Sequence, residues 1–231
     1  MPLHIGIVGC SAEGAALCYR TICAEAPTLL GQAHAHPPVS MHTSSLAEYV
    51  ECLSRGDLDG IAALMLDSAR RLAAAGADFL ICPDNTIHAA WDRVQPRSPL
   101  PWLHIAQEVA QEARRRAIRR AGITGTAWLV DSDVYPRALA AQGIECVRPP
   151  AADRDEVARI IMDELVPGIV REESTMKLLA VIGRLREQGC DGVVLGCTEL
   201  PLVIGDANSP LPTLDSTRLL ARAALRRALA G

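Results

Sequence analysis

Two short polar segments of the chain hold the residues whose types could perform chemistry. Asp84-Asn85-Thr86 follows one apolar run, and Cys197-Thr198-Glu199 follows another. A thiolate can remove a proton from a carbon acid, and a carboxyl group can donate or accept one. Hydroxyl, amide and backbone N–H groups beside them can bind a carboxylate. The two segments therefore indicate proton transfer at a carbon atom of a small carboxylate-bearing molecule.

The two segments occupy matching positions in an ungapped internal repeat. Residues 71–86 align with residues 184–199, with Arg, Leu, Gly and Asp at identical offsets, and Asp84 falls opposite Cys197. In open parallel α/β sheets, ligands bind beyond the carboxyl ends of the strands, where both segments are expected. Two lobes related by a pseudo-twofold axis would place Asp84 and Cys197 on opposite sides of one cleft. A proton could then leave one face of a carbon and return on the other.

The elements that must position these residues follow an alternating pattern. Short apolar runs alternate with helical patterns along the whole chain, which is typical of α/β proteins with parallel sheets. We predict two similar doubly wound lobes, residues 1–100 with 208–231 and residues 101–207. Aromatic residues make up only 3% of the chain, so the core must be mostly aliphatic, as in helices packed on parallel strands. Strands are expected at residues 3–8, 39–41, 79–82, 127–130, 145–148 and 192–195. Helices are expected at residues 13–24, 61–75, 134–142, 154–165, 174–188 and 216–229, and a further helix after the Pro-rich segment 96–101 is expected to end at residue 120.

Composition argues against several classes of protein. A formal net charge of -4 argues against a nucleic-acid partner, and the run Arg114-Arg115-Arg116 reads as a solvated helix face. Nothing approaches the roughly 20 apolar residues of a membrane span, and the first residues do not resemble a signal peptide, so we expect a cytoplasmic protein. The eight cysteines include no CxxC pair, which disfavours zinc and dithiol chemistry. No metal site is expected.

Two cofactors are also disfavoured by the sequence. The segment from Gly6 to Gly9 follows a strand, but GxGxxG and a ribose-binding acid are missing, so a dinucleotide domain is not expected. Lys177 is the only lysine, and it lies in a helical pattern rather than in a motif-like loop, which disfavours pyridoxal phosphate. We therefore expect chemistry without a cofactor.

The two motifs resemble those of a known superfamily. Residues 84–88, Asp-Asn-Thr-Ile-His, and residues 196–199, Gly-Cys-Thr-Glu, resemble the paired Cys-Asn-Thr and Gly-Cys-Thr-Glu motifs of the aspartate/glutamate racemases. Residues 5–11, 103–106 and 214–217 are similar to further family segments, so the resemblance spans nearly the entire chain. It implies a homodimer and racemisation by two thiols, one on each face of Cα. This chain departs from that pattern, because Asp84 stands at the first thiol position and Cys82 lies two residues upstream.

Cys197 and Asp84 are the candidate catalytic residues. Cys197 follows a strand and a glycine, with backbone N–H groups beyond it, and such a setting favours a thiolate. Asp84 could protonate a carbanion if burial keeps it in the acid form, or could abstract the proton as a carboxylate. It could instead order the loop or cap the next helix. His88 matches the family motif, and a purely structural histidine is an equal interpretation.

The remaining candidates would bind the substrate. The resemblance assigns Asn85, Thr86 and Thr198, together with the motif residue Glu199, to substrate binding, with the donors on the α-carboxylate. Ser11 at the end of the first strand could touch the ligand or serve as a turn residue. Arg171 lies near where some relatives place a basic side chain, and it could clamp a distal carboxylate or lie on the surface.

The leading hypothesis is a cofactor-independent racemase of aspartate or glutamate. The alternatives are a single-cysteine decarboxylase or an isomerase of a small dicarboxylate, and a carboxylate-binding relative without catalysis. The charge of Asp84 speaks against the apolar pocket that a decarboxylase needs, and the missing first thiol speaks against a maleate isomerase. Deuterium uptake at Cα from heavy water would distinguish a racemase from a binding protein.

Overall fold

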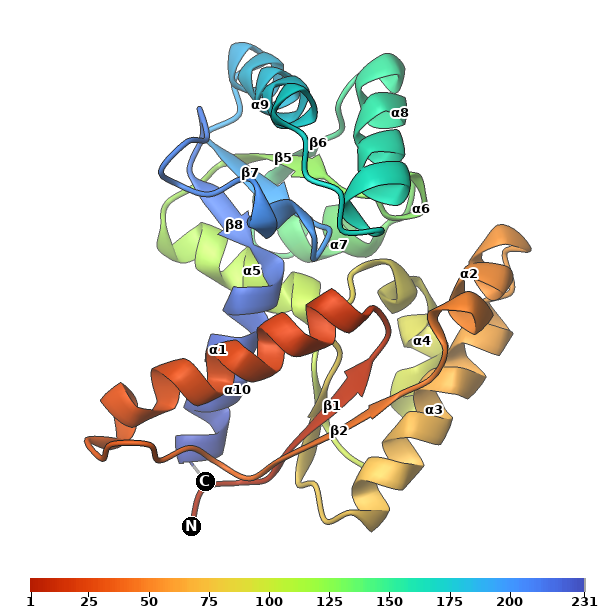
Figure 1. The fold of residues 1–231 in the computed structure, drawn as a ribbon, viewed down its shortest axis with the longest axis vertical. Helices are drawn as coiled ribbons and strands as arrows, with labels where there is room; N and C mark the ends of the chain where they lie inside the picture. The colour runs from red at the N-terminus through yellow and green to blue at the C-terminus, as the bar shows by residue number, and fades with distance from the viewer. Residues whose placement is uncertain (231) are drawn as a thin grey trace. The chain divides into compact units, whose positions relative to one another are not determined.

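The computed structural model describes residues 1–230, which divide into two compact units. Unit 1 comprises residues 1–105 and the C-terminal segment from Thr217, and unit 2 comprises residues 106–216. Each unit contains one four-stranded parallel sheet with helices around it (Figure 1). The predicted α/β class with two parallel-sheet lobes is confirmed.

The sheet of unit 1 has the strand order β2-β1-β3-β4. Successive residues of its central strands point to opposite faces, as the pleat requires. Ile7 and Ile81 pack with Ile22 of α1 and with α10, whereas Val8 and Leu80 pack with α2 and α3. The sheet is therefore covered on both faces. Its elements are β1 (Ile5–Gly9), α1 (Ala12–Leu30), β2 (Val39–Thr43), α2 (Leu46–Ser54), α3 (Leu58–Ala74), β3 (Phe79–Ile81), η1 (Thr86–Ala90), α4 (Trp91–Val94), η2 (Gln95–Arg97), β4 (Trp102–Leu103) and α10 (Ser216–Ala230).

The sheet of unit 2 repeats this topology in the order β6-β5-β7-β8. Val193 and Leu195 of β7 pack against α8, the π-helical turn η3 and α9, and Figure 1 shows α5 and α7 on the other face of this sheet. Its elements are α5 (Ile105–Arg115), β5 (Arg120–Thr124), α6 (Ala127–Val130), α7 (Val134–Ala140), β6 (Glu145–Val147), α8 (Ala151–Ile160), η3 (Ile161–Leu165), α9 (Glu172–Glu187), β7 (Gly192–Leu195), η4 (Leu200–Leu202) and β8 (Thr213–Asp215).

The residues shared by the internal repeat perform the same structural tasks in both units. Gly76 and Gly189 end α3 and α9 with φ of 87° and 86°, a conformation that glycine adopts without strain. The Asp78 carboxylate accepts the backbone N–H of His4 at 2.7 Å, just before β1. The Asp191 carboxylate accepts the backbone N–H of Arg120 at 2.9 Å, at the start of β5. The repeat therefore encodes a helix stop and a tie between neighbouring strands.

Two predictions around residue 120 are wrong. Residues 127–130, expected as a strand, form the short helix α6, and the central strand β5 lies at residues 120–124, where a helix was expected to end. A four-residue apolar run does not distinguish strand from helix by its periodicity. Here Thr126 decides the outcome, because its hydroxyl accepts the backbone N–H of Leu129 at 3.3 Å and caps a helix. The short strands β4 and β8 were not predicted either.

No helix among residues 1–230 is both long enough and apolar enough to cross a membrane.

Candidate active site

The two motif loops begin at the carboxyl ends of β3 and β7. These strands hold equivalent places in their sheets, each hydrogen-bonded to the central strand of its unit on one side and to a short last strand on the other. Asp84 lies three residues after the end of β3, and Cys197 lies two residues after the end of β7. Each loop is therefore where ligands of parallel α/β sheets bind.

The loop after β7 brings Cys197, Thr198 and Glu199 into one hydrogen-bonded group. The Cys197 thiol donates to Glu199 Oε2 at 2.9 Å, and the Thr198 hydroxyl donates to the same oxygen at 2.8 Å. Cys197 is only 8% exposed and Glu199 only 3%. A carboxylate this close to a thiol can accept its proton and release a thiolate. Glu199 was predicted from the sequence to contact the substrate. In the structure it accepts a hydrogen bond from the Cys197 thiol, and its contact with a substrate stays a prediction.

Gly196 allows this loop to leave the sheet. Its backbone N–H donates to the Thr124 carbonyl at 2.8 Å, and a Cβ atom at this position would lie 2.6 Å from that same oxygen. Only glycine lets the end of β7 approach β5 so closely. The Ser216 hydroxyl holds the neighbouring Leu195 carbonyl at 2.8 Å. The backbone before Cys197 is thus fixed from two sides.

The loop after β3 is fixed through Asp84. Asp84 Oδ1 accepts the backbone N–H of Ile87 at 3.1 Å, and the Asp84 carbonyl accepts a hydrogen bond from His88 Nδ1 at 2.6 Å. Asp84 therefore orders its own loop, one of the alternatives that the sequence left open. Asn85 and Thr86 are buried beside it. Asn85 occupies the cap position of η1, but its side chain forms no capping bond.

Cys82 lies two residues before Asp84. Its side chain is completely buried. Burial first, and the charge of Asp84 next, raise the pKa of the Cys82 thiol well above its ordinary value. A thiol with a raised pKa stays protonated and is a poor base. The distinctive group of this loop is therefore the Asp84 carboxyl.

His88 lies in a cluster of aromatic rings beside this loop. Its ring centroid is 5.8 Å from that of Trp91 and 4.6 Å from that of His104. Burial first, and the nearby His104 next, hold the pKa of His88 well below its usual range, so the ring is neutral. Because a carbonyl only accepts, Nδ1 carries the proton that binds Asp84. His88 Nε2 is buried without a hydrogen-bond partner among residues 1–230.

Ser11 lies at the carboxyl end of β1, the strand next to β3. Its hydroxyl accepts the backbone N–H of Gly14 at 3.1 Å and caps α1. The structural alternative for Ser11 is thus realised, and its position at the same edge of the sheet as the Asp84 loop agrees with a ligand-facing role as well.

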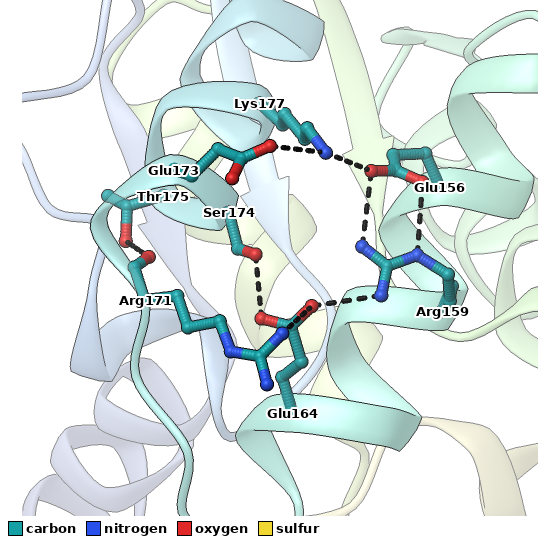
Figure 2. Close-up of polar contacts among 8 residues, drawn as sticks. All are labelled: Glu156, Arg159, Glu164, Arg171, Glu173, Ser174, Thr175 and Lys177. Atoms are coloured by element: carbon teal, nitrogen blue, oxygen red, sulfur yellow. Dashed lines mark hydrogen bonds and ion pairs between the residues drawn. The ribbon is translucent and has the colours of Figure 1, made fainter.

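Arg171 belongs to a network around the buried Glu164 in unit 2 (Figure 2). Its side chain is 62% exposed, and its Nη1 lies 3.9 Å from Glu164 Oε1. Glu164 is held more closely by the Ser174 hydroxyl at 2.6 Å and by Arg159 Nη1 at 2.9 Å. These contacts, Ser174 first, lower the pKa of Glu164. Within the described residues, no hydrogen bond or ion pair joins Arg171 to the Cys197 loop.

Sequence reasoning missed one polar residue at the edge of the second sheet. Thr126 follows β5, the strand next to β7, and is buried. The pairing of β1 with β3 and of β5 with β7 aligns residues 5–9 with residues 121–125. That alignment matches Gly125 with Gly9 and places Thr126 directly after the matched glycine, at the end of β5. Among residues 1–230, no group of three or more His, Cys, Asp and Glu side chains could hold a metal ion.

The fold and the two loops define the class of this protein. The fold with two parallel α/β units is shared with the solved structures of an aspartate racemase homologue and of a glutamate racemase. The family model for Asp/Glu/hydantoin racemases matches residues 5–224. The chain belongs to this family.

Three relatives illustrate the similarity. A Yersinia pestis protein assigned to the Asp/Glu racemases is 31% identical with a TM-score of 0.89, covering 98% of this chain and 99% of its own. An aspartate racemase homologue from Pyrococcus horikoshii OT3, PH1733, is 27% identical with a TM-score of 0.83, covering 99% and 100%. The broad specificity amino-acid racemase RacX of Bacillus subtilis (strain 168) is 27% identical over 177 residues, 75% of each chain.

Proposed function

We propose that this protein is a cofactor-independent racemase of acidic amino acids, aspartate or glutamate, in which Cys197 and Asp84 transfer the Cα proton. The observation that carries the proposal is the thiol of Cys197 bound to the Glu199 carboxylate at the carboxyl end of β7. The repeat makes this position equivalent to that of Asp84 after β3. Membership of the Asp/Glu/hydantoin racemase family supports racemisation as the reaction.

The proposed reaction begins with the transfer of the Cys197 thiol proton to Glu199. The thiolate removes the Cα proton of one enantiomer and becomes a thiol again, leaving a carbanion. Asp84, in its acid form, delivers a proton to the other face of Cα and becomes a carboxylate. The opposite enantiomer follows the reverse route, with the Asp84 carboxylate as base and the Cys197 thiol as acid. After the first route, solvent takes the proton held by Glu199 and returns one to Asp84, which restores the starting state.

Substrate binding uses the donors of the two loops. We propose that Asn85, Thr86 and Thr198 bind the α-carboxylate, where their donors would also stabilise the planar carbanion. Ser11 would contact the substrate from the end of β1, at the same edge of the unit 1 sheet. Arg171 would bind the distal carboxylate, because its guanidinium is largely exposed and only loosely held by Glu164. The distal contact would favour aspartate and glutamate over neutral amino acids.

Deuterium uptake at Cα tests the proposal. The protein is incubated in heavy water with the L and D enantiomers of aspartate, glutamate, alanine and serine. We expect uptake into an acidic amino acid and, in Cys197→Ala, its loss for the enantiomer whose proton Cys197 removes. Cys190→Ala is the matched control, because Cys190 is a buried thiol of the same unit that lies before β7 rather than after it. Uptake by Cys197→Ala at the wild-type rate would overturn the mechanism.

A single thiol at the paired positions also fits a second candidate, a single-cysteine decarboxylase or isomerase of a small dicarboxylate. A decarboxylase would release CO2 from substituted malonates and take up one deuterium in the product, without racemising any amino acid. A carboxylate-binding relative would be stabilised against heat by acidic amino acids with no uptake. A substituted malonate added to the set of samples, together with thermal unfolding in the presence of each amino acid, separates these outcomes.

A further inference from the structure

Two hydrogen bonds connect Asp84 with the residues that follow it. His88 Nδ1–H donates to the Asp84 carbonyl at 2.6 Å, and the Ile87 backbone N–H donates to Asp84 Oδ1 at 3.1 Å. The two bonds hold different parts of Asp84, since one fixes its peptide plane and the other its carboxyl group. Together they restrict both the backbone and the side chain of the residue.

A histidine at position 88 carries a cost that an apolar ring would avoid. Its side chain is 2% exposed, and Nε2 is buried with no partner among the described residues. An unsatisfied buried polar atom costs about 1–3 kcal/mol. Phenylalanine could fill the same space between Trp91 and His104 without that cost. What histidine adds to the packing of an apolar ring is the hydrogen bond to the Asp84 carbonyl.

We infer that His88 is a positioning residue for Asp84, which it holds through the Asp84 carbonyl so that the carboxyl meets Cα on one face only. This inference rests on the proposed function. Displacement of a reacting group by about 1 Å can cost roughly 100-fold in rate. A loosened Asp84 loop therefore impairs the proton transfers made by Asp84 and leaves those made by Cys197 less affected.

The experiment compares the two enantiomers of one amino acid in heavy water. Asp84→Asn first identifies the enantiomer whose deuterium uptake depends on Asp84. The measured quantity is the uptake rate of that enantiomer divided by the rate of the other. His88→Phe keeps the aromatic ring and removes the donor. His88→Asn places an amide N–H where Nδ1 was, and Trp91→Phe perturbs the ring cluster while leaving the donor in place.

We expect His88→Phe to lower this ratio by about 10-fold or more. His88→Asn should recover part of it, and Trp91→Phe should leave it unchanged. A purely structural role predicts that both rates fall together and that the loss follows the unfolding temperature. A wild-type ratio in His88→Phe, or an equal fall of both rates, would overturn the inference.

A second measurement is independent of activity. Amide hydrogen exchange of residues 84–88 should accelerate in His88→Phe relative to the rest of unit 1, and more than in Trp91→Phe. Unchanged protection of these amides would overturn the inference by itself. If the wild-type protein took up no deuterium into any amino acid, the proposed function would fail, and the amide measurement would still decide whether His88 holds the loop.

Discussion

The Cys197 thiol lies 2.9 Å from Glu199 Oε2, and the two residues share a loop in which both are almost completely buried. This contact joins a nucleophile to a group that can accept its proton, in a setting from which most water is excluded. Thr198 donates to the same carboxylate oxygen and so fixes the direction in which it points. The thiol proton of Cys197 therefore lies in a hydrogen bond to the Glu199 carboxylate, a group that can accept it.

Replacement of Glu199 by glutamine should slow the reaction without unfolding the protein. The amide retains the size of the side chain but cannot take the thiol proton. General acid–base catalysis contributes about 10²–10⁴-fold, so we expect deuterium uptake to fall by about 100-fold for the enantiomer whose proton Cys197 removes. The measurement is uptake at Cα together with circular dichroism. Glu199→Gln at the wild-type rate would show that the carboxylate does not activate Cys197.

Replacement of Asp84 by asparagine separates its two roles. The asparagine Oδ1 can still accept the Ile87 N–H, so the loop should keep its shape. Proton transfer at this position is lost, and racemisation should fall by about 100-fold or more. Uptake through Cys197 should be lost to a smaller degree, which gives a bias between L and D substrates. Equal losses for both enantiomers would mean that Asp84 only orders the loop.

Replacement of Arg171 by alanine should change the choice of substrate. An arginine–carboxylate bond contributes about 1.5–3 kcal/mol, so KM for aspartate and glutamate should rise about 10- to 100-fold. KM for alanine or serine, where these are substrates, should stay within a few-fold. Stability should change little, because Arg171 is largely exposed and its contact with Glu164 is long. An equal effect on all substrates would argue against a contact with the distal carboxylate.

Replacement of Gly196 by alanine tests the close approach of β7 and β5. The added Cβ would lie 2.6 Å from the Thr124 carbonyl, a backbone atom that cannot rotate away. We expect a loss of about 1–3 kcal/mol in unfolding free energy and a larger proportional loss of activity, because Cys197 is displaced. Gly205→Ala is the control, since its Cβ would meet nothing within 4 Å. Urea unfolding and deuterium uptake measure both effects.

The buried neutral ring of His88 predicts a dependence of stability on pH. Its folded pKa is lowered well below the usual value of 6.5, so the unfolded chain binds the proton more readily. The unfolding free energy should therefore fall as pH drops below about 6.5, by up to about 1.4 kcal/mol per pH unit. His88→Phe removes this contribution. Urea unfolding between pH 8 and pH 5 should show a smaller loss in the variant, and equal slopes would contradict the prediction.

The sequence by itself determined the architecture and the position of both loops. Two pairs of repeated residues have the same local role in both units. Gly76 and Gly189 each end a helix, and Asp78 and Asp191 each bind the backbone N–H at the start of a neighbouring strand. Parallel topology then requires that Asp84 and Cys197 follow equivalent strands. The types of these residues, the internal repeat and the resemblance to the racemase motifs together led to the prediction of proton transfer at carbon, which stays a prediction.

Only the tertiary structure decided which groups touch. The Cys197–Glu199 bond and the His88–Asp84 bond depend on rotamers and loop geometry, which no hydrophobic periodicity encodes. The strand β5 escaped prediction because Ile123 is its only large apolar residue, and its place in the sheet is set by pairing with β6 and β7 on either side. Arg171 was placed by analogy of position, and the structure supplied its neighbour, Glu164. Residue types, helix stops and strand ends can be predicted from the local sequence. Contacts between side chains form only when the helices and strands pack together.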